Sequence, residues 1–259
     1  MSKISDTSKT HSLNDHLAYV DEEFITHAEL RSQRIGLELL KVEMALQKYG
    51  IRSTVVLFGG ARIPEPGQEA WAAKNEIQKK NLQAMSHYYD AAREFARLCS
   101  CYSATTKYRE FVVVTGGGPG IMEAGNRGAA DVGALTVGLN IVLPHEQVPN
   151  NYITPQLCFN FHYLGMRKMH FLMRAKAFAI FPGGFGTLDE LFETLTLMQT
   201  GRTKQVPILM FGKEFWKNII NLDYLCTQGV ISDSDVDFVK FVDTATEAFE
   251  AIRSFYKLS

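Results

Sequence analysis

Short apolar runs alternate with longer amphipathic stretches from residue 53 to the end of the chain. The short runs are rich in β-branched and aromatic residues, as buried strands are, and the longer stretches repeat apolar positions at helical spacing. We therefore predict strands at residues 53–58, 111–115, 135–139, 157–161, 178–181, 206–211 and 238–242. Helices are expected between them, at residues 68–98, 121–130, 165–176, 191–199, 214–225 and 245–256.

This alternation predicts an α/β fold that is Rossmann-like and doubly wound, with a mostly parallel sheet and helices on both faces. Before it, apolar residues recur at helical spacing from Glu23 to Tyr49, and Gly50 is a suitable C-terminal stop. We expect residues 1–50 to form an N-terminal tail and helical extension, with residues 1–15 frayed. Residues 51–259 are expected to form a single domain. The extension would pack either on this domain or on a second subunit.

Two of the predicted strand-to-helix connections are rich in glycine. One reads GGGPG at residues 116–120, and the other reads PGGFGTLDE at residues 182–190. The amino end of a helix has unpaired N–H groups and the positive end of the helix dipole, so it is a favourable place for a phosphate. In a doubly wound sheet, ligands bind at the carboxyl ends of the strands, so one ligand can contact both turns.

The second turn also permits an interpretation without a ligand. Thr187 and Glu190 have the spacing of a capping box, in which the two side chains satisfy the first N–H groups of the helix. A capping box does not account for Gly183, Gly184 and Gly186, because a short turn rarely needs three residues without a Cβ unless something approaches the backbone closely. The spacing therefore favours a phosphate site.

Other nucleotide-binding and catalytic motifs are absent from the sequence. GGGPG lacks the G-x-G-x-x-G spacing, and the next predicted strand is followed by Asn140 rather than by an acid that would hold a ribose diol. A dinucleotide-dependent oxidoreductase is therefore disfavoured. No P-loop lysine follows either glycine turn, and no G-x-S-x-G motif of a serine hydrolase is present.

Two adjacent cations, Arg167 and Lys168, fall in the expected first turn of a helix, where they oppose the helix dipole unless an anion compensates. A ligand-binding pair and an ordinary surface pair on a helix that begins earlier remain equal alternatives. Arg62, just after the first predicted strand, either meets a phosphate or is a solvated or interface residue. The buried stripe of the helix at 165–176 is expected to contain Met166, Met169, Leu172 and Met173.

Composition limits the partners and the compartment. The chain has 259 residues, 46% of them hydrophobic, and a net charge of -1, so it can bury a sizeable core but gives no reason to expect nucleic acid or an anionic membrane as partner. Its four cysteines show no C-x-x-C pair and no zinc-ligand spacing, which predicts buried free thiols, no metal site and a reducing cytoplasm. Neither a signal peptide nor a membrane-spanning segment is expected.

The combination of Met166-Arg167-Lys168, PGGFGTLDE and an upstream GGGPGIME resembles the LOG ("Lonely guy") family of phosphoribohydrolases, many of whose members carry the label "lysine decarboxylase". The resemblance implies a Rossmann-like nucleotide-binding catalytic domain. It implies hydrolysis of the N-glycosidic bond of a nucleoside 5′-monophosphate, such as AMP or a cytokinin riboside monophosphate, to the free base and ribose 5-phosphate. It also implies a homo-oligomer, at least a dimer, and we expect no cofactor.

The same resemblance assigns roles to individual residues. Arg167 and Glu190 match the catalytic pair, and Glu190 would stabilise positive charge on the sugar or direct water to C1′. No residue identifies itself as the acid for the departing base. The expected substrate-binding residues are Lys168, Gly117, Gly118, Gly183, Gly184, Phe185, Gly186, Thr187, Leu188, Asp189 and Thr196.

Some features differ from the better-known plant and fungal pattern. The N-terminal helix, the insertion at residues 64–85 and the sequence FGGAR in the first turn resemble the larger bacterial branch, which favours AMP or a related purine nucleotide. An alternative is a non-catalytic nucleotide or molybdenum-cofactor carrier on the same fold. Amino-acid decarboxylation is disfavoured, because no lysine has the context of a pyridoxal Schiff base. The sequence does not name the base, the pathway or the oligomer size.

Overall fold

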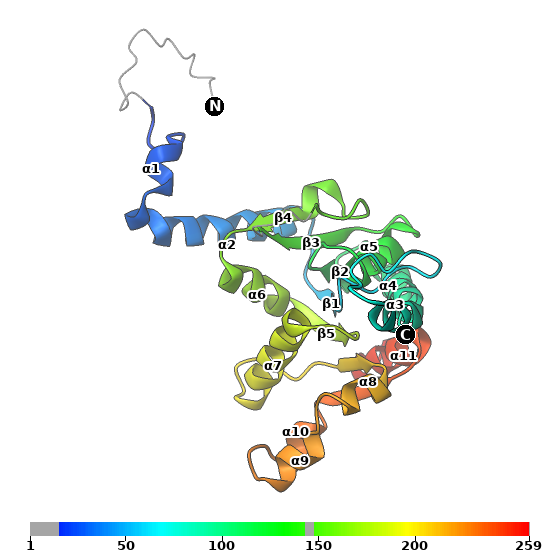
Figure 1. Cartoon of the computed structure of the whole chain (residues 1–259). Helices are drawn as coiled ribbons and strands as arrows, with labels where there is room; N and C mark the ends of the chain where they lie inside the picture. The colour runs from blue at the N-terminus through cyan, green and yellow to red at the C-terminus, as the bar shows by residue number, and fades with distance from the viewer. Residues whose placement is uncertain (1–15, 143–147, 259) are drawn as a thin grey trace.

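The structure, a computed structural model, describes residues 16–142 and 148–258, and a sheet of seven parallel strands lies at its centre (Figure 1). The strand order is β4-β3-β2-β1-β5-β6-β7, so the predicted doubly wound, Rossmann-like sheet is confirmed. The strands are β1 (Thr54–Phe58), β2 (Val112–Thr115), β3 (Thr136–Ile141), β4 (Cys158–Phe161), β5 (Ala175–Ile180), β6 (Ile208–Phe211) and β7 (Val239–Val242).

Helices precede the sheet and connect its strands on both faces. Helices α1 (Glu22–Thr26) and α2 (Arg31–Lys48) precede β1, and a 3-10 turn (Ala28–Leu30) separates them. The connecting helices are α3 (Glu76–Ala84) and α4 (His87–Thr105) before β2, α5 (Ile121–Ala130) before β3, α6 (Leu164–Met173) before β5, α7 (Phe185–Gln199) before β6, and α8 (Lys213–Lys217), α9 (Leu222–Thr227) and α10 (Asp233–Val236) before β7. Helix α11 (Ala245–Tyr256) follows β7, and a second 3-10 turn (Pro155–Leu157) precedes β4.

Successive strand residues are buried on opposite faces of the sheet. In β1, Val55 and Leu57 pack with α4, α5 and α11, whereas Val56 and Phe58 pack with α2, α6 and α7. This follows from the two-residue period of a strand, and it explains why the strands read as continuous apolar runs. The predicted division of the chain at residue 50 remains a prediction, although α2 contributes Val42 and Leu46 to the second of these cores.

A buried polar network centred on Asn126 joins α5 to two strands. Its side chain accepts a hydrogen bond from Thr115 Oγ1 (2.6 Å) and donates one to Thr136 Oγ1 (2.7 Å). Asn150 Nδ2 donates to Asn126 Oδ1 as well, at 2.9 Å. Because buried polar groups are costly when unpaired, this network sets the position of α5 relative to β2 and β3.

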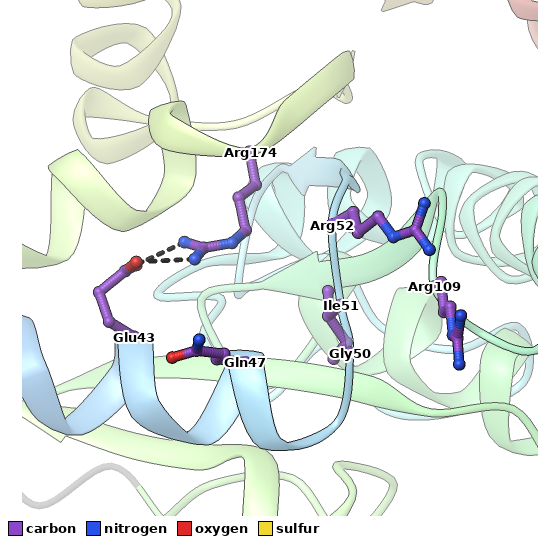
Figure 2. Close-up of a pocket in the computed structure, with 7 residues that line it drawn as sticks. All are labelled: Glu43, Gln47, Gly50, Ile51, Arg52, Arg109 and Arg174. Atoms are coloured by element: carbon purple, nitrogen blue, oxygen red, sulfur yellow. Dashed lines mark hydrogen bonds and ion pairs between the residues drawn. The ribbon is translucent and has the colours of Figure 1, made fainter.

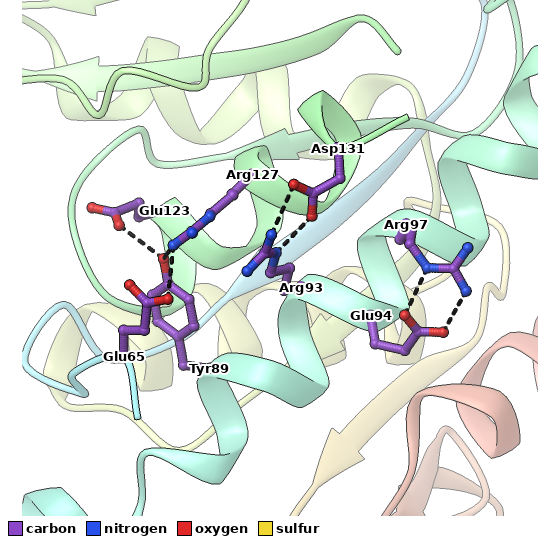
Figure 3. Close-up of polar contacts among 8 residues, drawn as sticks. All are labelled: Glu65, Tyr89, Arg93, Glu94, Arg97, Glu123, Arg127 and Asp131. Carbon is purple, nitrogen blue, oxygen red and sulfur yellow. Dashed lines mark hydrogen bonds and ion pairs between the residues drawn. The ribbon is translucent and has the colours of Figure 1, made fainter. Parts of the chain in front are cut away.

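A second polar cluster, at the surface of α4 and α5, holds the loop that follows β1 (Figure 3). The hydroxyl of Tyr89 donates to Glu123 at 2.8 Å, and Arg127 donates to Glu65 of the loop at 2.9 Å. Arg127 and Glu65 are each less than one-third exposed, so this ion pair is better shielded from water than a surface pair. The loop after β1 is therefore tied to the helix that follows β2.

The N-terminal helix expected from Glu23 to Tyr49 is interrupted. Arg34 donates hydrogen bonds from its guanidinium group to the carbonyls of Ile25 and His27, at 2.8 and 2.6 Å, and so caps the end of α1. The expected stop at Gly50 agrees with the structure, where this residue has φ of 67° after the end of α2. The frayed tail expected at residues 1–15 lies outside the described residues.

Two other predicted helices are also divided. The stretch 68–98 is not one helix: α3 begins only after Asn75, whose side chain accepts from Gln78 N at 2.9 Å, and α4 follows from His87 and continues to Thr105. The stretch 214–225 divides where Asn221 caps α9 by accepting from Tyr224 N. Helix α10 was not predicted. At Asn75 and Asn221 a polar side chain stabilises a new helix start, which apolar spacing does not report, whereas α4 begins without a side-chain cap.

The helix predicted at 165–176 is shorter, and its buried face is different. It ends at Met173, because the Arg174 carbonyl accepts from Thr54 N (2.9 Å) as β5 begins beside β1. Phe171 and His170 face the interior, and Phe171 packs against Phe58 at 4.9 Å between ring centroids. The expected stripe was therefore wrong in part: Met169 and Met173 are 39% and 48% exposed.

The four cysteines are free, as expected, but they are not all buried. Cys99 is fully buried, whereas Cys101, two residues later on the same helix, is exposed. Two residues in a helix differ by about 200° in direction, so only one of the pair can face the core. No helix in residues 16–142 or 148–258 is long and apolar enough to cross a membrane.

The Asn126 network gives the first testable prediction. Asn126→Ala leaves two buried threonines and the half-buried Asn150 without their hydrogen bonds, and we expect it to lower the free energy of unfolding by roughly 2–3 kcal/mol. Urea denaturation followed by far-UV circular dichroism measures this change. Asn151→Ala, at an exposed asparagine, is the matched control and should change it by less than about 0.5 kcal/mol. Equal effects of the two substitutions would contradict the structural role of Asn126.

Candidate functional site

The residues of the predicted phosphate site lie where the strand order of the sheet reverses. Strand β1 pairs with β2 on one side and with β5 on the other, so the chain changes direction across the sheet between β1 and β5. There the loops after the two strands touch, and Gly60 N donates to the Pro182 carbonyl at 2.9 Å. A cavity of about 710 Å³ opens at this point. Ligands of open α/β sheets bind at such a position.

The amino end of α7 opens into this cavity. Helix α7 begins at Phe185 with Gly184 as N-cap, and the first helical bond runs from Leu188 N to the Gly184 carbonyl. No side chain caps this end, and the N–H groups of Phe185, Gly186 and Thr187 have no acceptor among the described residues. Three unpaired amides at the positive end of a 15-residue helix have the arrangement that favours an anion, and the binding of a phosphate there remains a prediction.

The capping box considered for Thr187 and Glu190 does not form. Thr187 is the third residue of α7, not its N-cap, because the helix starts three residues earlier than that pattern requires. Both side chains are buried, and Glu190 lies in the lining of the cavity. Helix capping therefore does not explain the spacing of Thr187 and Glu190.

The three glycines of the turn differ in what the fold requires of them. A Cβ on Gly183 would lie 3.0 Å from Gly60 N and would collide with the Thr187 side chain, so packing alone explains this glycine. A Cβ on Gly184 or Gly186 would meet nothing within 4 Å, and neither residue has a positive φ. Since neither packing nor backbone conformation requires them, close approach of a ligand is the remaining reason for both glycines.

Glu190 is the most perturbed carboxyl group of the cavity. Its residue is 6% exposed, and burial raises the pKa of its carboxyl group to about 7, while the nearby charges of Arg167 and Lys168 lower it. No hydrogen bond reaches this carboxylate from any residue that the structure describes. Burial outweighs both cations, so the carboxyl group exchanges its proton near neutral pH, which suits an acid or base in catalysis.

Arg167 reaches the same cavity from α6. Its Nε donates to the Leu139 carbonyl at 2.7 Å, and its guanidinium lies over the Phe171 ring, 5.1 Å from the centroid. Burial lowers the pKa of Arg167, and Glu190 opposes that effect. A Cβ on Gly116 would lie 2.5 Å from an Arg167 Nη atom, so the first glycine turn makes room for this guanidinium. The two predicted catalytic residues thus share one buried environment.

Lys168, the neighbour of Arg167, lies outside the lining of the cavity. Its Nζ is 3.0 Å from carboxylate oxygens of both Asp189 and Glu193 on α7. These two ion pairs connect α6 to α7, and one of the two partners, Asp189, lines the cavity. Arg167 and Lys168 lie in the second turn of α6, not in the first as expected, because the helix begins at Leu164.

Some expected substrate contacts are not brought to the cavity, while the others from Gly183 to Asp189 line it. Gly117 and Gly118 belong to the first glycine turn, where their carbonyls accept from Asn150 at 2.9–3.1 Å. Only Gly116 of that turn lines the cavity. Thr196 lies beside a separate hollow of about 100 Å³, and its hydroxyl donates to the Phe192 carbonyl. Their proposed contacts with a substrate remain predictions.

Sequence reasoning missed the apolar wall of the cavity. This wall comes from four different elements and consists of Leu82, Met85, Met122, Leu164 and Phe215. Each residue reads as ordinary core or surface in its own helix, so nothing in the local sequence pattern marks it as part of a site. Arg62, which the sequence left undecided, is exposed and also lines the cavity. Within residues 16–142 and 148–258, no group of three His, Cys, Asp or Glu side chains is placed to hold a metal.

Known proteins are similar to this chain in sequence and in fold. The family model described as "Possible lysine decarboxylase" matches residues 122–252, which is half of the chain and includes α6, β5 and α7. The chain belongs to this family, the LOG family.

The LOG family relatives include two plant proteins. A probable cytokinin riboside 5′-monophosphate phosphoribohydrolase of Oryza sativa subsp. japonica is 25% identical over 152 residues, covering 56% of this chain and 68% of that protein. A cytokinin riboside 5′-monophosphate phosphoribohydrolase of Arabidopsis thaliana is 25% identical over 147 residues, covering 56% and 67%.

Solved structures share the fold of this LOG family member. The molybdenum cofactor binding protein of Rippkaea orientalis superposes with a TM-score of 0.50 at 16% identity, covering 79% of this chain and 98% of that one. The molybdenum cofactor carrier protein of Chlamydomonas reinhardtii superposes with a TM-score of 0.51 at 14% identity, covering 80% and 99%. At such identities the likeness extends to the fold alone.

The burial of Glu190 predicts a pH-dependent cost in stability. Below about pH 4.5 the carboxyl group is protonated in both the folded and unfolded chain, so burial costs nothing extra. As pH rises towards 7, only the unfolded chain releases the proton, and the folded state loses stability. Glu190→Gln should therefore gain stability relative to wild type, from near zero at pH 4 to on the order of 2–3 kcal/mol at pH 8.

Urea unfolding of both proteins at a series of pH values measures this difference. Glu69→Gln, at an exposed glutamate, controls for the substitution itself. If the difference in the free energy of unfolding between Glu190→Gln and wild type does not change with pH, the raised pKa is contradicted.

Proposed function

We propose that the protein hydrolyses the N-glycosidic bond of a nucleoside 5′-monophosphate, AMP or a related purine nucleotide, and releases the base and ribose 5-phosphate. The observation that carries this proposal is Glu190: a buried carboxyl group with a pKa of about 7, in one cavity with Arg167 and the uncapped end of α7. The activity for which the two plant relatives are named is consistent with this reaction class.

The amino end of α7 is proposed to bind the 5′-phosphate. The free amides of Phe185, Gly186 and Thr187 supply donors, and the open space at Gly184 and Gly186 permits close approach. Arg167 adds a full positive charge in a site where burial strengthens electrostatic attraction. The phosphate then places the ribose over the next turn of α7, on which Glu190 lies.

The reaction requires charge stabilisation at the sugar. As the bond between C1′ and the base nitrogen breaks, its electron pair leaves with the base, and positive charge develops on C1′ and the ring oxygen. The Glu190 carboxylate stabilises this charge and directs a water molecule, whose oxygen bonds to C1′ while the base gains a proton. Glu190 is one turn from the amides that hold the phosphate, so both parts of the substrate are positioned by a single rigid helix.

The apolar wall suits the planar base. Leu82 and Met85 come from α3 and the residue that follows it, in the segment inserted relative to the plant pattern, and Phe215 comes from α8. Methionine adapts its shape to a flat ring, and phenylalanine stacks on one. A purine held there would lie in a less polar environment than its phosphate. Such an environment suits a base that leaves as a neutral molecule.

A non-catalytic carrier on the same fold would need the amides and the apolar wall, but not Glu190. Burying a carboxyl group without a hydrogen-bonding partner is unfavourable for folding, and phosphate binding gains nothing from a nearby negative charge. The cost is understandable only if the group acts in the reaction, which favours the hydrolase over the carrier.

A homo-oligomer, at least a dimer, is part of the proposal. Apolar side chains lie exposed on α2 and α6, two helices that contact each other: Leu37, Leu40 and Met44 on α2, and Met169 and Met173 on α6. Contiguous exposed apolar surface on a soluble chain is typical of a subunit contact. The free cysteines agree with the cytoplasmic location that we also propose.

Incubation of the purified protein with nucleoside 5′-monophosphates tests the reaction. We expect free adenine and ribose 5-phosphate from AMP, detected by liquid chromatography. Glu190→Ala should lower kcat by about 100- to 10,000-fold, because the charge at C1′ loses its stabilising group, while the Kd for AMP measured by calorimetry changes little. If no nucleotide yields its base, the hydrolase is ruled out. Unchanged turnover in Glu190→Ala would remove Glu190 from the mechanism.

The glycines of α7 provide a separate test of phosphate binding. Gly186→Ala adds a Cβ into open space in a helix, so it should leave the fold intact or stabilise it by about 0.5–1 kcal/mol. The added methyl group should nevertheless raise KM for AMP by about tenfold or more, because it blocks approach to the amides. Gly36→Ala, in α2, also points into open space and is the matched control, with the same gain in stability and no effect on KM. Equal KM values for the two variants would contradict the phosphate position.

A further inference from the structure

A second cavity, of about 560 Å³, lies at the opposite edge of the sheet, where the strands begin (Figure 2). Three arginines line it, and each comes from the chain just before a strand: Arg52 before β1, Arg109 before β2 and Arg174 before β5. These three strands are neighbours at the centre of the sheet, so their starting points converge. The cavity shares no lining residue with the site at the carboxyl edge.

The arginines are not needed to cap the helix that ends beside them. After α2, Gly50 adopts φ of 67°, its N–H donates to the Gln47 carbonyl, and Ile51 N donates to the Leu46 carbonyl, both at 2.9 Å. This is a Schellman motif, in which the backbone itself satisfies the last carbonyls of a helix. The three arginines are therefore not required as caps of α2.

Only one of the three guanidinium groups is neutralised within the cavity. Arg174 forms two hydrogen bonds with the Glu43 carboxylate, one of them 2.7 Å long, and the bond to Arg174 lowers the pKa of Glu43. Arg52 lies 3.9 Å from Glu110, near the limit for an ion pair. Arg109 has no acidic partner among the residues that the structure describes. Figure 2 shows Arg174 turned towards Glu43, while Arg52 and Arg109 extend away from it.

An anion is thus the chemical counterpart of this cavity. Guanidinium groups bind phosphate oxygens in pairs of parallel hydrogen bonds, and two of them facing one pocket match a ligand with two or more negative charges. The C-terminal ends of α2 and α6 contribute partial negative charge, which two full positive charges outweigh. The volume lies within the range of small-molecule pockets.

We infer that this cavity is a second ligand site, which binds a small phosphorylated anion through Arg52 and Arg109. Arg52 N and Ser53 N both donate to the Arg109 carbonyl, at 2.7 and 3.3 Å, so the backbones that carry the two arginines are fixed to each other. The backbone positions from which the two side chains extend are therefore fixed, and a pyrophosphate group bridges the two guanidinium groups. The site lies at the opposite edge of the sheet from the proposed reaction.

Titration calorimetry with pyrophosphate as probe tests the inference on the full chain. Wild type should bind pyrophosphate, and a higher salt concentration should weaken the binding, because both arginines are exposed. Arg52→Ala and Arg109→Ala should each raise the Kd by about tenfold or more, because each removes a charged hydrogen-bonding pair. Arg202→Ala, at an exposed arginine outside the cavity, is the matched control and should leave the Kd unchanged. Far-UV circular dichroism confirms that each variant is folded.

The other anion site of the molecule supplies the decisive comparison. Gly186→Ala should weaken AMP binding and leave the Kd for pyrophosphate unchanged. Arg52→Ala and Arg109→Ala should raise the Kd for pyrophosphate and leave AMP binding unchanged. Pyrophosphate binding that is absent in wild type, that survives both arginine substitutions, or that is lost only in Gly186→Ala would overturn the inference. Each of these results is independent of whether AMP is hydrolysed.

Discussion

The contact between the loops after β1 and β5 is the constraint on which the site depends. Gly60 N and the Pro182 carbonyl bond at 2.9 Å, and a Cβ on Gly183 would come within 3.0 Å of Gly60 N. This close contact leaves the chain one route out of β5, into a helix whose first amides face the crevice. The packed glycine sets the direction of α7, and the two open glycines after it leave space in front of that helix. Backbone packing and ligand access are thus divided between neighbouring residues of one turn.

The burial of Glu190 is the second element of the site, and it is a consequence of the same helix. Because α7 begins at Phe185, Glu190 falls on its inner face, next to Arg167 from α6. Arg167 is half-buried and bound to the Leu139 carbonyl, and its guanidinium does not form a bidentate ion pair with the carboxylate. Burial therefore dominates over the cation, and the carboxyl group keeps a pKa of about 7. A surface pair of the same residues would leave both groups ionised and without chemical use at neutral pH.

Much of this fold can be predicted from the sequence, and the exceptions share a cause. Apolar runs such as Val112–Thr115 locate six of the seven strands to within two residues, because a strand buried on both faces is apolar throughout, whereas β5 begins three residues before its predicted start. Helix starts at Asn75 and Asn221, and the stop at His27, depend on single polar hydrogen bonds that apolar spacing does not record. The exposed faces of Met169 and Met173 depend on what neighbours the helix, which one sequence segment does not contain.

The residues of the site also divide into those with a local sequence signal and those that are brought together from distant segments. Glycine turns carry a local signal, so the sequence alone predicts a phosphate site at residues 182–190, and this remains a prediction. The apolar wall and the three arginines at the opposite edge are assembled from distant segments, and each residue alone resembles ordinary core or surface. Lys168 shows the reverse case, because it is next to Arg167 in sequence but does not line the cavity, and its charge is paired with Asp189 and Glu193.

Helix α6 extends from one edge of the sheet to the other. Arg167 lies in its second turn beside the carboxyl-edge cavity, and Arg174 is its C-cap beside the amino-edge cavity. Helix α6 has ten residues and is about 15 Å long, and it places one arginine beside each cavity. The two cavities therefore share one rigid element. A ligand that displaced α6 at one cavity would therefore change the affinity of the other cavity, and thermodynamic linkage requires this coupling to be equal in both directions.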